Sequence, residues 1–167
     1  KGYGTSLQQD YVTYTYTANG KVATVTDANG TLATQSWDAF DRKSRWTFPS
    51  KTTAGLASTT DYEDYAYDAA SNRTSLRKRD GRTFTFTYDA LNRMTSKVVP
   101  DACVSGFTCT NVAASATRDV FYGYDNRGLQ LFARFDSTAG EGITNVFDNM
   151  GRPSSSATNM GGVTRTL

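Results

Sequence analysis

Short runs in which apolar and polar residues alternate recur along this sequence. In residues 82–88 aromatic residues alternate with threonine, so Phe84, Phe86 and Tyr88 point to one side and the threonines to the other. This period of two predicts a β-strand with one half-buried face. Residues 12–16 show the same alternation and predict another strand of this kind.

The strand at residues 82–88 leads directly into a tight turn. Asp89 takes the first position of this turn, where its carboxylate can accept a backbone N–H. Asn92 stands three residues later, and asparagine tolerates the positive φ that the return of the chain often needs. The pattern therefore predicts a strand, a tight turn and a second strand.

The same pattern occurs six times in the sequence, and we call each copy a Tyr-Asp station. The aromatic residues that open the stations are 21, 30, 21, 36 and 23 residues apart, which indicates a repeat of about 21 residues with insertions. A period in this range is typical of an array built by stacking. The turn residues of the stations are Tyr16 and Gly20; Trp37 and Asp38; Tyr67 and Asp68; Tyr88, Asp89 and Asn92; Tyr124, Asp125 and Gly128; Phe147, Asp148 and Gly151.

A second turn follows each station by 12 or 13 residues. Asp80-Gly81 and Asn29-Gly30 are dipeptides that favour tight hairpins. Two longer insertions, at about 50–60 and 101–116, begin at the corresponding place in their own repeats. Length variation therefore falls at the second turn, and we expect both insertions to emerge from the same rim of the sheet.

The recurring Tyr-Asp-x-x-Gly-Arg pattern resembles the YD-repeat, or RHS-repeat, proteins of bacteria and of animal teneurins. The resemblance covers residues 11–167, although Thr17, Ser71, Trp37 and Phe147 depart from the pattern. We expect an all-β fold, a spiralling antiparallel β-sheet of about six two-stranded YD repeats with two inserted loops. We also expect one repeat region over 1–167, with a loose lead-in at 1–10. Because the chain opens with Lys1, we interpret it as an internal piece of a longer protein.

The amino-acid composition argues against several classes of function. The 13% share of aromatic residues and 20% share of charged residues favour strands, and a net charge of +2 is too small to bind nucleic acid by charge alone. No apolar run approaches the roughly 18 residues of a membrane span. The chain contains no histidine, which excludes Ser-His-Asp and Cys-His catalysis and histidine-ligated metals.

The charged residues of the stations allow two interpretations. The aspartates could hold Ca²⁺, but calcium needs six to eight oxygens within a short loop, so turn capping explains one aspartate per repeat better. The basic residues that end the turns, Lys21, Arg42, Arg93 and Arg152, could pair with aspartates of the neighbouring repeat or form a stripe that binds phosphate or acidic glycans. We therefore predict no cofactor and no metal.

Cys103 and Cys109 are the two cysteines, and both lie in the second insertion. An even count in a polar, threonine-rich chain suggests oxidising surroundings, and a disulfide between them is the expectation. Free thiols are the alternative. Zinc would require further cysteine or histidine ligands, which the chain lacks.

Three functions compete. The first is a non-catalytic shell or scaffold in an extracellular or cell-surface protein, secreted by a bacterium, whose partners are further YD repeats of the same or identical chains joined through strand edges. In bacterial toxins the resembling repeats form a hollow shell around a cargo domain. The second is an adhesion module that binds cell-surface carbohydrate through exposed aromatic residues such as Trp37 and Trp46. The third, an enzyme, has no visible nucleophile or paired acids, so we expect none.

Overall fold

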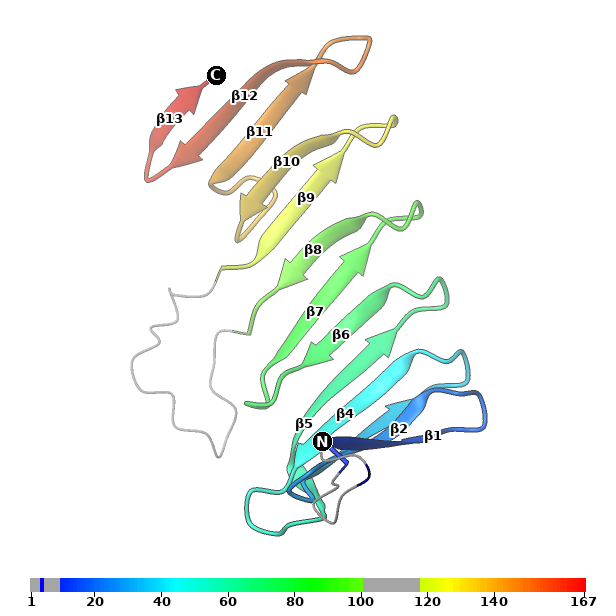
Figure 1. Cartoon of the computed structure of the whole chain (residues 1–167). Coiled ribbons are helices and arrows are strands. Elements are labelled where there is room, and N and C mark those ends of the chain that lie inside the picture. Colours follow the sequence, from blue (N-terminus) through cyan, green and yellow to red (C-terminus); the bar gives the residue numbers. More distant parts are fainter. Residues whose placement is uncertain (1–3, 5–9, 101–117) are drawn as a thin grey trace. The chain divides into compact units, whose positions relative to one another are not determined.

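A computed structural model describes residue 4 and residues 10–100 and 118–167 of the chain. Among these residues there are strands and turns but no helix (Figure 1). The strands are β1 Val12–Tyr16, β2 Val22–Asp27, β3 Leu32–Trp37, β4 Lys43–Pro49, β5 Ala57–Tyr67, β6 Arg73–Arg77, β7 Thr83–Tyr88, β8 Met94–Val98, β9 Val120–Tyr124, β10 Gln130–Phe135, β11 Gly142–Phe147, β12 Pro153–Met160 and β13 Val163–Thr166.

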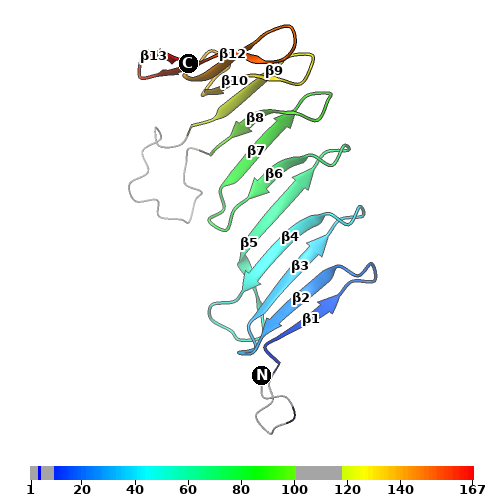
Figure 2. The same cartoon turned by 45° about the horizontal axis from the view of Figure 1, so that its top comes forward.

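The strands form one open sheet in which each strand lies beside its neighbours in the chain, in the order β1 to β13. The described strand pairs are antiparallel, for example β1 with β2 and β7 with β8 (Figure 2). The predicted all-β antiparallel fold is therefore confirmed. Sequential antiparallel pairing also explains the short connections, because a hairpin turn is enough to join each strand to the next.

The chain divides into two compact units. The first comprises Lys1–Ala66 and Ser75–Arg82, and the second comprises Tyr67–Thr74 and Thr83–Leu167. The first unit contains two Tyr-Asp turns, after β1 and β3. The second contains four, after β5, β7, β9 and β11.

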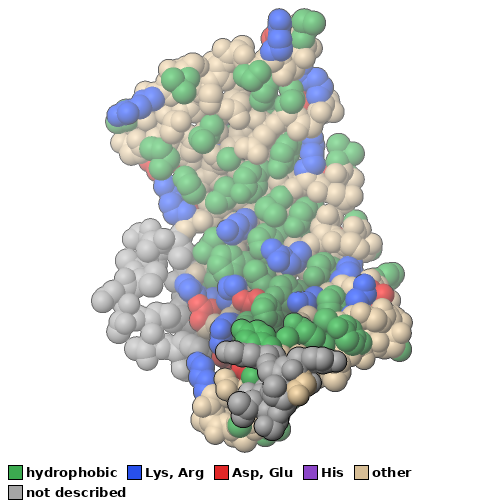
Figure 3. Space-filling model, viewed as in Figure 1, with side chains coloured by type: hydrophobic (Ala, Val, Ile, Leu, Met, Phe, Trp, Pro, Cys, Tyr) green, Lys and Arg blue, Asp and Glu red, His purple; other side chains and the backbone are tan. Residues whose placement is uncertain are grey.

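Little of the described chain is buried, because its described residues form one sheet and none of them packs on that sheet as a second layer. Phe86 and Ser96, each 7% exposed, are the only buried side chains in the described parts apart from the glycine backbone. Tyr14 and Tyr16 on β1 are 49% and 60% exposed. Hydrophobic side chains accordingly remain visible on the surface (Figure 3).

The first insertion is shorter than the sequence predicts. We expected a loop over about 50–60, but β5 already begins at Ala57, which pairs with Pro49. The next register pair is Tyr62 with Thr47, so residues 58–61 bulge out of the strand. Ser and Thr residues look like loop in the sequence, yet they can start a strand when a neighbouring strand is present to pair with it. The second insertion lies outside the described residues.

Candidate functional site

The six Tyr-Asp turns share one backbone geometry. Each station aromatic is the last residue of its strand, and the next residue opens the turn. In the turn after β7, Asn92 N donates to Asp89 O and Asp89 N donates to Arg93 O, both at 3.0 Å. This is a hairpin loop with a one-residue bulge, whose fourth residue adopts positive φ. The fourth residues have φ between 59° and 89° and are Gly20, Asp41, Ser71, Asn92, Gly128 and Gly151.

The aspartate that opens each turn ties it together. Asp89 Oδ1 accepts the backbone N–H groups of Leu91 at 2.9 Å and Arg93 at 3.0 Å, and Oδ2 accepts Arg93 Nε at 2.7 Å. These bonds, led by the one from the Arg93 backbone, lower the pKa of Asp89. Thr17 holds the same position in the first station, where its Oγ1 accepts Lys21 N at 3.1 Å. The aspartates thus act within their own turns.

The station arginines correct one expectation from the sequence. Arg42, Arg93 and Arg152 each form an ion pair with the aspartate of their own station, because the bulged turn brings its fifth side chain beside its first. The distances are 2.7 Å for Arg42–Asp38, Arg93–Asp89 and Arg152–Asp148. Arg93 does reach the next station, but through the backbone: its Nη1 donates to Asp125 O at 2.9 Å.

Arg127 performs this role from another position in the turn, which the sequence did not reveal. The fifth residue of that station is Leu129, yet Arg127 Nε donates to Asp125 Oδ2 at 2.8 Å and its Nη1 donates to Asp148 O at 2.8 Å. The guanidinium group therefore occupies the same place although its residue lies two positions earlier. The sequence did contain a signal for this substitution: Leu129 stands where most of the other stations have a basic residue, and Arg127 lies two residues before it.

The station aromatics form a second contact between repeats. Tyr88 Oη donates to Arg73 O and Tyr124 Oη to Met94 O, both at 3.0 Å. Trp37 Nε1 donates to Val22 O at 2.8 Å. In each case the acceptor is the residue six positions after the preceding station aromatic.

Phe147 has no polar atom for this contact, and a neighbouring residue replaces it. Asn145 lies two positions before Phe147, and its Nδ2 donates to Gln130 O at 3.0 Å. Gln130 is again six positions after the preceding station aromatic, Tyr124. The contact is thus kept although the residue that makes it has changed.

These carbonyl groups need side-chain donors because adjacent repeats pair over a short length. Between β2 and β3 the register runs from Thr24↔Thr34 to Thr26↔Leu32, and Val22 lies beyond it. Between β10 and β11 it starts at Phe132↔Thr144, and Gln130 lies beyond it. Since unpaired backbone groups away from water are costly, the station side chains replace the missing strand hydrogen bonds.

The two tryptophans are partly covered by cations and are not among the strongly exposed apolar side chains. Lys21 Nζ and Lys43 Nζ lie 6.0 and 5.5 Å from the ring centroid of Trp37. Lys43 Nζ also lies 5.0 Å from Trp46, which stacks on Phe48 at 4.8 Å. Lysines on the ring faces compete with a sugar for these surfaces, so the tryptophans offer little support for a carbohydrate platform.

Other predicted sites are located as follows. Cys103 and Cys109 lie outside the described residues, so their disulfide stays a prediction. The described residues include no group of three or more Asp, Glu, Cys or His side chains arranged to hold a metal ion. Within the same residues no helix has the length and apolar character needed to cross a bilayer.

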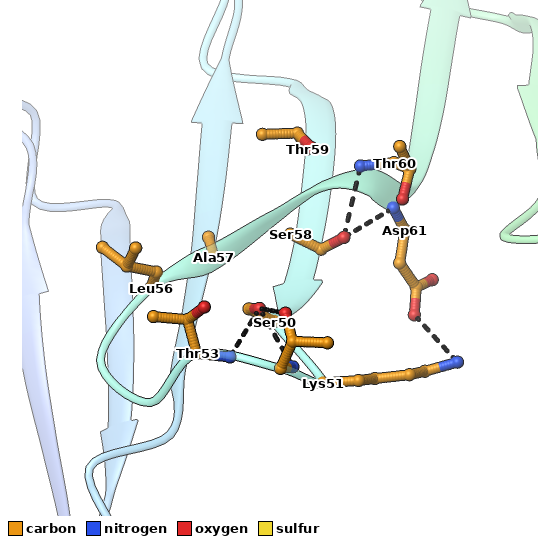
Figure 4. A pocket seen from close by; sticks show the side chains of 10 residues that line it. Ser50, Lys51, Thr53, Leu56, Ala57, Ser58, Thr59, Thr60 and Asp61 are labelled. Carbon is orange, nitrogen blue, oxygen red and sulfur yellow. Dashed lines mark hydrogen bonds and ion pairs between the residues drawn. The ribbon is translucent and has the colours of Figure 1, made fainter.

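The first insertion surrounds a pocket of about 480 Å³ (Figure 4). Residues 50–53 and 56–61 line it, and all of them belong to the first unit. Ser50 N donates to Leu56 O at 2.9 Å and closes the loop, while Gly55 N donates to Gly30 O at 3.0 Å and ties the loop to the turn after β2.

Part of the chain matches a known protein family. Residues 67–102 match the family model described as RHS Repeat. A search of curated protein sequences found no match.

Several solved structures share the fold. A TcdB2–TccC3–Cdc42 structure has a TM-score of 0.63 at 17% identity, and TcdB2–TccC3 without its hypervariable C-terminal region has 0.62 at 18%. The Photorhabdus luminescens Tc holotoxin pore with the TccC3 mutation D651A has 0.61 at 16%. Each covers 88% of this chain, whereas the chain spans only 7% of theirs. The resemblance predicted from the Tyr-Asp stations is therefore confirmed: residues 67–102 match the RHS repeat, and the sheet shares the fold of these toxin structures.

Proposed function

We propose that this chain is a non-catalytic structural repeat region of an extracellular, secreted RHS-repeat protein, in which it forms part of a shell or scaffold. Its partners are further YD repeats of the same or identical chains. The observation that carries the proposal is the joint between repeats, in which Tyr124 donates to Met94 O and Arg93 to Asp125 O. Both acceptors are backbone carbonyl groups, so one repeat can follow another largely regardless of side chains.

The exposed edge of the first unit supports this role. Tyr11, Tyr14 and Tyr16 are 81%, 49% and 60% exposed, and among the described strands β1 pairs with β2 alone. A strand with a free edge offers unpaired N–H and C=O groups to another strand. In the longer protein a preceding strand would cover these groups, and the sheet would continue as a spiral around a cargo domain.

The test is negative-stain electron microscopy of the whole chain, together with a mass measurement of the particles in solution. We expect filaments or particles much larger than one chain. The variant Tyr14→Lys/Tyr16→Lys should give smaller particles with an unchanged circular dichroism spectrum, because charge on an edge strand disfavours pairing. Ile143→Lys, an equally apolar-to-charged change at a residue 43% exposed in the sheet interior, is the matched control.

Wild-type particles of single-chain mass at all concentrations would contradict assembly through strand edges. Hydrolytic turnover by the purified chain would contradict the non-catalytic role. A shell role further predicts that the longer protein protects an adjoining domain from protease. Equal digestion of that domain with and without the repeats would argue for an open scaffold instead.

A further inference from the structure

The insertion after β4 is the longest of the described second turns. Four, five and six residues join β2 to β3, β6 to β7 and β10 to β11, whereas seven residues, 50–56, join β4 to β5 and a bulge at residues 58–61 follows them. The scaffold geometry needs neither addition, since β2 and β3 pair without them. Extra loop length on a regular framework is where binding functions are commonly found.

Two serines hold the loop and the bulge open around the pocket. Ser50 Oγ accepts the backbone N–H groups of Thr52 at 3.3 Å and Thr53 at 3.1 Å. Ser58 Oγ accepts those of Thr60 at 3.2 Å and Asp61 at 2.9 Å (Figure 4). The pocket volume of about 480 Å³ falls in the range of small-molecule sites, roughly 300–1,000 Å³.

The two charged side chains that line the pocket, Lys51 and Asp61, carry opposite charges. Asp61 Oδ1 accepts Arg79 Nε at 2.7 Å and Oδ2 accepts Arg79 Nη2 at 2.6 Å, and Lys51 Nζ lies 3.9 Å from Oδ2. The hydrogen bonds from Arg79, followed by its charge and that of Lys51, outweigh burial and lower the pKa of Asp61, so this carboxylate stays ionised and paired. A cation would have to displace Arg79, and an anion would meet Asp61. The site therefore favours a neutral ligand.

The rest of the lining consists of serine and threonine side chains and two apolar side chains, Leu56 and Ala57. Ser58 Oγ accepts two N–H groups, and its own O–H has no acceptor among the described residues, so it is available to donate to a ligand. Thr53, Thr59 and Thr60 add hydroxyl and methyl groups, and Leu56 is 57% exposed. Alternating hydroxyl groups and small apolar surfaces match the surface of a sugar ring.

We propose that the pocket formed by residues 50–53 and 56–61 binds a neutral saccharide unit. The site does not use Trp37 or Trp46, and it is independent of the scaffold role, because no residue of the inter-repeat joints lines it. A saccharide held here would attach the sheet to a glycan through the rim that carries the insertion.

The test is a ¹H–¹⁵N NMR titration of the whole chain with glucose, galactose, mannose, N-acetylglucosamine and lactose, followed by sodium phosphate and calcium chloride. At least one sugar should shift the amide signals of Thr53, Ser58 and Asp61 in a saturable way. Thr53→Val keeps the shape and the backbone N–H, removes the hydroxyl, and should weaken binding roughly two- to tenfold. Ser58→Ala should act similarly, and Thr13→Val on β1 should change nothing.

The proposal is overturned if no sugar shifts these amides, if phosphate or calcium shifts them and sugars do not, or if sugars shift the tryptophan indole signals alone. Unchanged binding in Thr53→Val would also overturn it. Should Ser58→Ala disturb the bulge, Thr53→Val still decides, because it leaves the hydrogen bond from its backbone to Ser50 in place. Particle size in electron microscopy is unaffected by any of these results, so this inference and the scaffold function fail separately.

Discussion

At the residue scale, the fourth position of each Tyr-Asp turn carries the main conformational demand. Three stations meet it with glycine and three with Asp41, Ser71 and Asn92, all with positive φ. Glycine adopts this conformation without strain, whereas a residue with a Cβ pays roughly 1–2 kcal/mol. Two of these polar side chains also bond to the preceding station: Asp41 Oδ1 accepts Asn19 Nδ2 at 3.0 Å and Asn92 Oδ1 accepts Asn72 Nδ2 at 2.8 Å.

Gly128 provides a direct test of this demand. A Cβ added there meets no atom within 4 Å, so Gly128→Ala changes the backbone energy without a clash. We expect a loss of about 1–2 kcal/mol in the free energy of unfolding, measured by urea denaturation. Ser71→Gly should have the opposite sign, with a gain of about 0.5 kcal/mol after the added freedom of the unfolded chain is counted. If Gly128→Ala left the free energy of unfolding unchanged, the positive φ at this position would not be a significant constraint on the residue type.

At the element scale, adjacent repeats are joined by side chains where their strands have stopped pairing. The donor varies among tyrosine, tryptophan and asparagine, while the acceptor stays a carbonyl at a constant place in the preceding repeat. The joint is thus defined by its acceptor, and the donor can be exchanged.

Removing one donor should weaken one joint. Tyr124→Phe leaves the ring in place and deprives Met94 O of its hydrogen bond. We expect a loss of about 0.5–1.5 kcal/mol in the free energy of unfolding. Tyr14→Phe, at a residue 49% exposed whose hydroxyl has no partner in the described part of the chain, should stay within about 0.5 kcal/mol of wild type. Equal losses of stability in both variants would contradict a stabilising role for the hydrogen bond from Tyr124 to Met94 O.

In the fifth station, an arginine at position 129 should be able to replace the arginine at position 127. Arg127→Leu removes the bonds to Asp125 and to Asp148 O, and we expect a lower urea midpoint. Adding Leu129→Arg to that variant restores the arrangement of Arg93 in its own station and should recover most of the loss. A double variant no more stable than the single one would mean that Arg127 acts through some other contact.

At the scale of the whole molecule, the station aspartates respond to pH together. The pKa values of Asp38, Asp89, Asp125 and Asp148 are all lowered. For Asp89 and Asp148 the backbone N–H of the station arginine is the largest cause, while for Asp38 and Asp125 burial raises the pKa and hydrogen bonds outweigh it. The hydrogen bonds that these aspartates accept are therefore repeated along the chain, and each set weakens when its carboxylate is protonated.

Stability should accordingly fall in acid. Since these pKa values are lower in the folded than in the unfolded chain, their contribution is complete at neutral pH and is lost as the pH falls below about 4, through the folded values. Thermal midpoints measured from pH 7 down to about 2.5 should show this decline. Asp148→Asn should lie lower at pH 7 and decline less steeply, and a flat profile for wild type would contradict the account.

Local chemistry in the sequence determined the strands, the Tyr-Asp turns and the all-β class. Period-two alternation places Phe84 and Phe86 on one face, and an aspartate at the start of a turn captures N–H groups two and four residues ahead. These interactions span a few residues and need no partner from elsewhere in the chain.

The tertiary structure alone decided which atoms join the repeats and where β5 begins. Arg93 and Tyr124 reach carbonyl groups about 30 residues away. Met94 O lies beyond the paired part of β8 and β9, and Asp125 O accepts Gly128 N within its own turn as well as Arg93. The strand start at Ala57 depends in the same way on Pro49 lying beside it. Such features depend on the length of pairing between strands, which no local pattern of residues encodes.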